Sequence, residues 1–203
     1  MLVPMRAILD AADKNDYAQG AFNVNAVCQV KAAVDVHQIL RSPAIIQGAD
    51  LANGFMGGRT DFANSTLEDK KAGAKNIGAA VKKYAADSDI PVALHLDHGK
   101  NFDSCIAAIE GGYTSVMIDG SSLPFDENVE LTREVVKYAH ERGVTVEGEL
   151  GVLAGVEDHV FAATSTYTNP LSAIDFFKKT GVDALAISYG TMHGANKGKN
   201  AVI

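Results

Sequence analysis

The sequence predicts an α/β fold, a TIM (β/α)8 barrel of which about six βα units are present. Short apolar segments rich in β-forming residues alternate with amphipathic helical segments, and such alternation is typical of a parallel sheet covered by helices. All but one of the predicted strands end in a polar residue, and barrels collect their active sites at those ends. The first strand is not followed by G-x-G-x-x-G, so the main signature of an open dinucleotide-binding sheet is missing.

A short helix and two βα units are predicted in the first part of the chain. Pro4 favours a helix start directly after it, and Pro43 ends the helix that precedes it. The Gly-rich polar stretch 48–69 is expected to be a long loop. The predicted helices cover residues 5–13, 26–40 and 71–86, and the predicted strands cover residues 17–24 and 44–47.

Three further βα units and a last strand follow. Gly111 and Gly143 lie just after two of these helices, where glycine is typical of a helix C-terminus. A second long loop is expected over 151–169. The predicted strands cover residues 91–97, 115–118, 144–150 and 184–189, and the predicted helices cover residues 102–110, 126–142 and 170–180.

The length of the chain limits how complete this barrel can be. A closed barrel needs eight strands and typically ~250 residues, whereas this chain has 203 residues. Residues 195–203 are too few for another βα unit. We therefore expect residues 1–203 to form a single barrel domain that is incomplete at its C-terminal end.

The composition excludes several classes of partner. Hydrophobic residues make up 47% of the chain and the formal net charge is -7, which argues against a surface that binds nucleic acid. No apolar run is long enough to cross a bilayer, and the N-terminus lacks the pattern of a signal peptide. We expect a soluble cytoplasmic protein without nucleic-acid or membrane partners.

The two cysteines, Cys28 and Cys105, are expected on separate helices. They have no C-x-x-C spacing, so a disulfide or a metal-binding pair is disfavoured. We interpret both as small core residues in a reducing compartment.

The segment 93–99, Ala-Leu-His-Leu-Asp-His-Gly, contains the most informative residues. Side chains alternate along a strand, so His95 and Asp97 share one face while Leu94 and Leu96 share the other. Buried polar groups destabilise a fold unless they have partners. His98 follows at the end of the strand, where a histidine beside an aspartate could bind a metal and transfer a proton. A pair of hydrogen-bonded core residues is the alternative.

Further acidic and imidazole side chains follow the later strands, namely Asp119, Glu147, Glu149 and His193. Carboxylates gathered at one end of a barrel should repel one another and raise each other's pKa. A divalent cation relieves this repulsion, and imidazoles with carboxylates are ligands that zinc accepts. Independent capping of helix N-termini is the alternative, but it accounts for Asp119 better than for the others.

Four motifs in this order resemble those of the zinc-dependent class II fructose-bisphosphate aldolases, which include the tagatose-bisphosphate aldolases. Segments 3–5 and 20–25 extend the resemblance to the N-terminus. The motifs are Leu96-Asp97-His98-Gly99, Ile118-Asp119-Gly120-Ser121, Glu147-Gly148-Glu149-Leu150-Gly151 and Gly190-Thr191-Met192-His193-Gly194.

The resemblance implies a zinc site and a proton-transfer site. His98 and His193 match zinc ligands, and Asp97 matches the catalytic acid/base. Asp119 and Glu149 match carboxylates that hold the metal in an alternate position. Glu157 falls near a glutamate of a mobile loop that is assigned to proton transfer.

Substrate contacts are implied by the same resemblance. Asn23 and Gln47 fall where polar residues face the substrate, and Gly194 falls in the region that binds phosphate and a monovalent cation, Na+ or K+. The family often has a serine where this chain has Ala49. The family's third zinc histidine and its last two strands have no counterpart in this chain.

The resemblance implies reversible cleavage of fructose 1,6-bisphosphate to dihydroxyacetone phosphate and glyceraldehyde 3-phosphate, by a homo-oligomer that is a dimer or a tetramer. A tagatose-bisphosphate aldolase and a catalytically inactive truncated barrel are the alternatives. A Schiff-base aldolase needs a lysine on a strand, and the predicted strands contain none. A barrel metallohydrolase would need His-x-His where this chain has His95-Leu96-Asp97.

Overall fold

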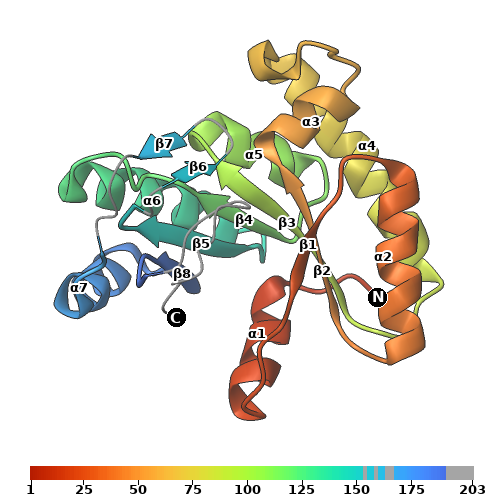
Figure 1. Ribbon diagram of the computed structural model, residues 1–203, viewed down its shortest axis with the longest axis horizontal. Helices are drawn as coiled ribbons and strands as arrows, with labels where there is room; N and C mark the ends of the chain where they lie inside the picture. The colour runs from red at the N-terminus through yellow and green to blue at the C-terminus, as the bar shows by residue number, and fades with distance from the viewer. Residues whose placement is uncertain (153–154, 158–159, 163–166, 191–203) are drawn as a thin grey trace.

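The sheet has six parallel strands whose spatial order follows the chain (Figure 1), β1-β2-β3-β4-β5-β8. The computed structural model describes residues 1–152, 155–157, 160–162 and 167–190. The strands are β1 (Ala21–Asn23), β2 (Ala44–Ala49), β3 (Val92–Gly99), β4 (Ser115–Ile118), β5 (Thr145–Leu150) and β8 (Ala184–Ile187). This confirms six units of a (β/α)8 barrel, open between β1 and β8.

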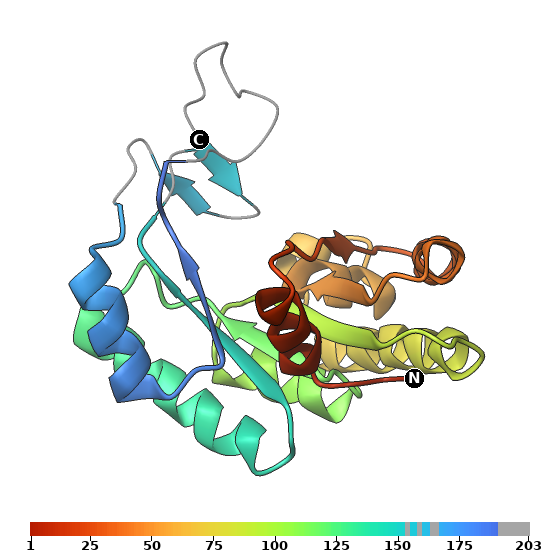
Figure 2. The same cartoon turned by 90° about the horizontal axis from the view of Figure 1, so that it is seen from below.

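Helices cover the convex face of the curved sheet, and one helix lies on the concave side (Figure 2). The helices on the convex face are α2 (Val27–Leu40), α3 (Asp50–Met56), α4 (Leu67–Ala86), α5 (Phe102–Glu110), α6 (Phe125–His140) and α7 (Pro170–Thr180). The main core lies between these helices and the sheet, and it includes Leu94 and Leu96 of β3. The predicted assignment of these two leucines to the face opposite His95 is confirmed.

The helix on the concave side, α1 (Met5–Lys14), closes the N-terminal end of the strands. Met5 and Ile8 pack there against Ile45 and Ala93, which point away from the main core. The backbone N–H of Arg6 donates to Thr145 Oγ1 at the start of β5 (3.1 Å). The first helix therefore plugs the interior of the partial barrel.

Residues 48–69 are not the long loop that the composition predicts. They form α3, which packs against α4, and a short 3-10 helix, η1 (Phe62–Asn64), which packs against α3. Helix α4 starts four residues before the predicted start of 71, because Thr66 and Asp69 form a reciprocal capping box.

The segment 151–169 also differs from the predicted loop. It contains two short antiparallel strands, β6 (Gly155–Glu157) and β7 (Val160–Ala162). This hairpin lies outside the six-stranded sheet.

The two cysteines lie in different environments. Cys105 is buried as predicted, but Cys28 is exposed on α2, so its assignment to the core is wrong.

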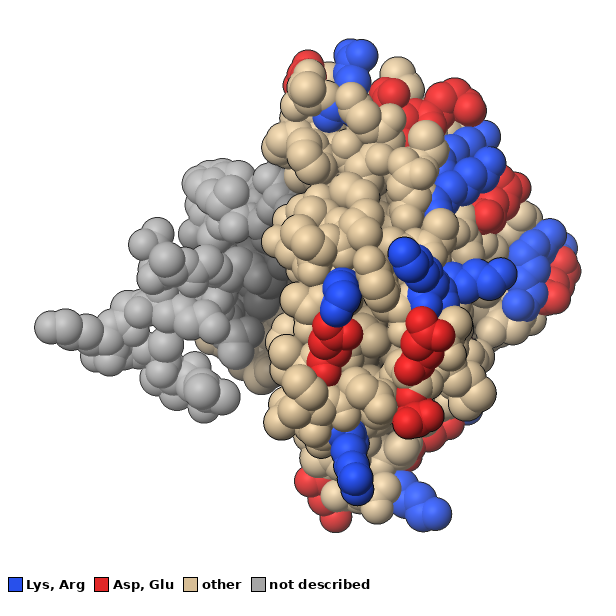
Figure 3. Space-filling model, turned by 90° about the vertical axis from the view of Figure 1, so that its right-hand side faces the viewer, with Lys and Arg blue, Asp and Glu red and all other residues tan. Residues whose placement is uncertain are grey.

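Acidic and basic side chains are interspersed on the face that carries α2 (Figure 3), as in the ion pair of Lys31 with Asp35. Among the described residues, no helix is both long and apolar enough to span a bilayer.

Candidate active site

A β-bulge near the end of β3 determines how the central side chains point. Leu96 pairs with Val116 and Gly99 pairs with Ile118, so β3 advances by three residues while β4 advances by two. His98, within the bulge, has a φ of 50°, in the left-handed region that few residues other than glycine adopt. Strict alternation would send Asp97 and His98 to opposite faces, whereas the bulge lets both point into the mouth of the partial barrel.

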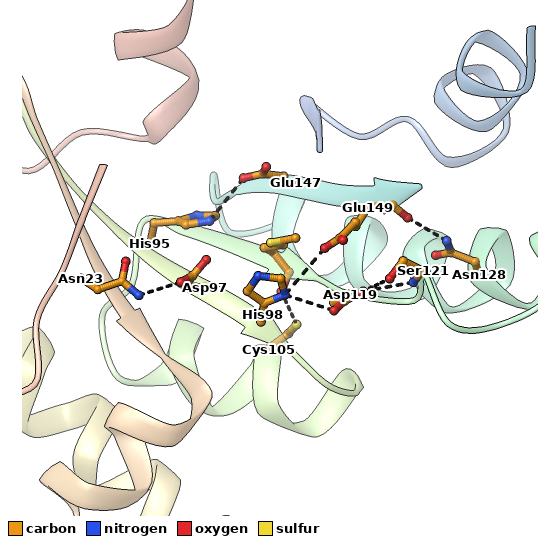
Figure 4. A network of polar contacts seen from close by, with 11 residues as sticks. Asn23, His95, Asp97, His98, Cys105, Asp119, Ser121, Asn128, Glu147 and Glu149 are labelled. Atoms are coloured by element: carbon orange, nitrogen blue, oxygen red, sulfur yellow. Dashed lines mark hydrogen bonds and ion pairs between the residues drawn. The ribbon is translucent and has the colours of Figure 1, made fainter. Parts of the chain in front are cut away.

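Three side chains from neighbouring strand ends meet at this mouth (Figure 4). His98 Nδ1 lies 3.0 Å from Asp119 Oδ2 and 3.6 Å from Glu149 Oε2. One possible ligand atom from each residue lies within 4.8 Å of the others. One imidazole nitrogen and two carboxylate oxygens in this arrangement suit a divalent transition metal such as zinc.

The carboxylate of Asp119 is held in place by a turn. Ser121 donates to Asp119 Oδ1 from its backbone N–H (3.1 Å) and its hydroxyl (2.6 Å). Burial raises the pKa of Asp119, but the hydrogen bonds from His98 and Ser121 outweigh burial and hold the pKa below its ordinary value. The expected rise from carboxylate repulsion is therefore wrong for Asp119.

His95 lies deeper in the interior, outside this cluster. Its Nδ1 lies 2.8 Å from Ser115 Oγ and its Nε2 lies 3.3 Å from Glu147 Oε2, so the ring connects β3 to β4 and β5. The side chain is only 3% exposed, and these partners offset its burial. His95 and Glu147 are thus a pair at ion-pair distance inside the partial barrel and not part of the metal cluster.

Asp97 is contacted by a side chain from the first strand of the sheet. Asn23 Nδ2, at the end of β1, donates to Asp97 Oδ2 (2.7 Å). A cavity of about 390 Å³ opens beside this pair, between the ends of β1 and β2 and helix α3. Its walls are Asn23, Asn25, Ala49, Leu51, Ala52, Phe55 and Phe62. Gln47 lies in register with Asn23 and with His95, so the three share the inner face of the sheet.

Cys105 lies close to the cluster but is not among the residues whose ligand atoms come together there. Its side chain is fully buried and its Sγ lies 3.7 Å from the carbonyl oxygen of Met117, toward which it can donate. Burial raises the pKa of this thiol strongly. The candidate ligands are therefore the imidazole and the carboxylates.

Some predicted site residues cannot be placed. His193 and Gly194 lie outside the described residues. Glu157 is the last residue of β6, but only its backbone is described.

Sequence reasoning missed the residues that support the site. Ser121 could have been found, because serine two positions after an aspartate is typical of an Asx turn. Ser115 and Asn128 carry no such local signal, since their partners are distant in the chain.

Comparisons with known proteins show which family the chain belongs to. The family described as "Fructose-bisphosphate aldolase class-II" matches residues 3–203. The chain is 48% identical over 200 residues to the fructose-bisphosphate aldolase of Treponema pallidum (strain Nichols), covering 97% of this chain and 56% of that protein. It is 40% identical to the fructose-bisphosphate aldolase of Geobacillus stearothermophilus, covering 98% of this chain and 64% of that protein.

A solved structure of an aldolase is similar to almost the whole of this chain. The YdjI aldolase of Escherichia coli K12 superimposes with a TM-score of 0.77 at 30% identity, covering 98% of this chain and 64% of that one. The chain thus spans between 56% and 64% of the length of these relatives. With the family match over residues 3–203, the chain belongs to the class II fructose-bisphosphate aldolase family.

Proposed function

We propose that the whole protein catalyses zinc-dependent, reversible cleavage of fructose 1,6-bisphosphate to dihydroxyacetone phosphate and glyceraldehyde 3-phosphate, in cytoplasmic sugar metabolism. The family membership and the names of the relatives support an aldolase. The observation that carries the proposal is the position of Asp97, fixed by Asn23 next to the cluster of His98, Asp119 and Glu149. A proton-transfer group and a set of metal ligands thus lie side by side.

The donor set fits the metal that the family implies. His98 would hold it together with His193, and Asp119 and Glu149 offer further oxygen donors within reach of the His98 ring. A bound zinc ion would supply a Lewis acid that polarises the substrate carbonyl. Cys105 is not part of this group of possible ligands.

Asp97 is the group that we assign to proton transfer. In cleavage its carboxylate accepts the proton of the C4 hydroxyl, and in condensation it returns that proton as a general acid. The hydrogen bond from Asn23 fixes the orientation of the carboxylate (2.7 Å). In the proposed mechanism, β1 and β3 would together hold the acid/base group in position.

The remaining roles rest on the resemblance alone. We assign substrate contacts to Asn23 and Gln47, proton transfer to Glu157, and the region that binds phosphate and a monovalent cation, Na+ or K+, to Gly194. Residues 1–203 would belong to one catalytic barrel domain that is completed by further chain. The protein would act as a homo-oligomer.

The decisive test is an Asp97→Ala variant of the full-length protein, assayed for cleavage of both fructose and tagatose 1,6-bisphosphate. We expect turnover to fall by about 10²–10⁴-fold, while the zinc content measured on the same sample stays near one ion per site. Loss of zinc in parallel with activity would mean that Asp97 is structural. Faster cleavage of tagatose 1,6-bisphosphate would replace the proposed substrate but leave the mechanism intact.

A further inference from the structure

We propose that Asn128 is a positioning residue that sets the distance between Asp119 and Glu149, and thereby the affinity of the cluster for a metal. This inference rests on the metal site of the proposed function. Asn128 lies in the first turn of α6, on the convex side of the sheet, and only 1% of its surface is exposed. It cannot reach the mouth of the barrel as a ligand, so any effect on the metal must pass through the backbone.

The amide group of Asn128 connects two segments that carry ligands. Its Nδ2 donates to the backbone carbonyl of Glu149 (2.8 Å), at the end of β5. Its Oδ1 accepts from the hydroxyl of Thr132, one turn further along α6 (3.1 Å). Figure 4 shows Asn128 next to Glu149 on the side away from His98. Since the Thr132 bond fixes which end of the amide faces β5, the carbonyl of Glu149 meets an oriented donor.

The same amide group touches the loop that follows β4. A Cβ atom built at Gly120 would lie 2.3 Å from Asn128 Oδ1 and 2.8 Å from its Cγ. Only a residue without a side chain can therefore pass so close to Asn128. Gly120 directly follows Asp119, so the amide lies against the backbone of both ligand-bearing segments.

Through these contacts Asn128 can set the distance between the side chains of Asp119 and Glu149, which come from different strands. Asp119 follows β4 and Glu149 lies on β5, and their side chains must stay within one coordination sphere. Groups outside the ligand shell that orient ligands typically contribute 10–100-fold to metal affinity. We expect an effect of that order from Asn128.

The test measures the affinity for Co2+ in the full-length protein by competition with a chelator, together with the visible absorption spectrum of the bound ion. Three variants form a cycle: Asn128→Ala, Gly120→Ala and the double variant. Each single substitution should weaken Co2+ binding about 10–100-fold and change the spectrum. The double variant should bind as Asn128→Ala does, because the added methyl group no longer has an amide to displace.

Two further variants separate positioning from general loss of stability. Thr132→Val removes the donor to Asn128 Oδ1 with little change of shape, and should weaken binding less than Asn128→Ala. Tyr113→Phe removes a buried hydrogen bond to Asn53 of α3 (2.7 Å), and should leave the Co2+ affinity and spectrum unchanged. If Asn128→Ala does not fold, Gly120→Ala and Thr132→Val still test the proposal.

The outcomes distinguish this inference from the proposed function. Wild-type affinity in the Asn128 and Gly120 variants, or effects that multiply in the double variant, would overturn the role of Asn128 and leave the metal site standing. If the wild type binds no Co2+, or if His98→Ala binds it as well as the wild type, the metal site itself is wrong and the role of Asn128 falls with it.

Discussion

His98 combines a strained backbone with a central position in the site. Its φ of 50° places a residue with a side chain in the left-handed region, at a free-energy cost of about 1–2 kcal/mol. Strain of this kind is typical of functional sites that are held by their surroundings. Here the hydrogen-bonding distance to Asp119 and the closing pair of Gly99 with Ile118 hold His98 in this conformation.

This backbone geometry predicts an inverted order of stability for two substitutions. At most positions a glycine variant is ~0.5–1 kcal/mol less stable than the alanine variant. We expect His98→Gly to be more stable than His98→Ala by roughly 1 kcal/mol, because only glycine relieves the strain. Urea unfolding in the presence of a chelator measures the difference.

A control in the same strand completes this experiment. Ala93→Gly lies in the regular part of β3 and should show the ordinary loss of stability. Equal stability of the two His98 variants would mean that the bulge relaxes once the imidazole is gone.

At the residue scale, the sequence predicts several of the side chains that gather at the strand ends, but not how they are oriented. Of the predicted site residues, the structure brings His98, Asp119 and Glu149 together and sets Asp97 against Asn23, while their chemical roles stay predictions. The bulge that brings His98 inward was not predicted, since strand alternation alone gives no register shift. The contact of Asn23 with Asp97 spans 74 residues of chain, and it forms only because β1, β2 and β3 are neighbours in the sheet.

At the scale of elements, glycines determine how closely α3 approaches α4. A Cβ atom at Gly73 of α4 would lie 1.7 Å from the carbonyl oxygen of Asn53 in α3, and one at Gly57 would lie 1.9 Å from the carbonyl oxygen of Asp69. This contact explains why 48–69 was wrongly predicted as a loop. Glycine is typical of loops, but here it permits close packing of helix backbones.

Gly73→Ala is therefore expected to destabilise the protein, although alanine favours a helix by up to ~1 kcal/mol. The added methyl group must push α3 away from α4, and we expect a net loss of about 1–3 kcal/mol. Chemical denaturation measures this loss. Lys75→Ala, at an exposed position of the same helix, is the control and should change stability little. A neutral or stabilising Gly73→Ala would mean that the two helices separate without loss.

Predictions of whole elements succeeded where apolar periodicity was strong. Helices 102–110 and 170–180 and strand 115–118 have the bounds that the sequence predicts. The hairpin of β6 and β7 was missed because each strand has only three residues. Segments that short carry no periodicity from which a strand can be predicted.

At the scale of the whole molecule, exposed apolar side chains lie on the two helices that flank the open edges of the sheet. The exposed fractions reach 79% for Ile39 of α2 and 76% for Leu171 of α7. In a closed barrel each helix has a neighbour on both sides. The helices at the ends of this open sheet lack one of these neighbours within the described part of the chain.

We expect the isolated 203-residue chain to self-associate through these surfaces, since exposed apolar patches and open strand edges favour association. Replacing Ile39 and Leu171 together by lysine should lower the weight-average mass in sedimentation experiments. The control pair, Glu127→Gln and Glu134→Gln, changes the net charge equally at exposed positions of α6. An equal drop in the control would attribute the effect to charge rather than to the apolar surfaces.

The plug formed by α1 has a consequence for access to the candidate site. Met5 and Ile8 close the interior at the N-terminal ends of the strands, so a molecule bound near His98 would arrive and leave past the strand ends that carry the cluster. If the proposed aldol cleavage takes place there, both fragments of the sugar would leave on that same side. The outer fragment would then leave first, and in the reverse direction it would enter last.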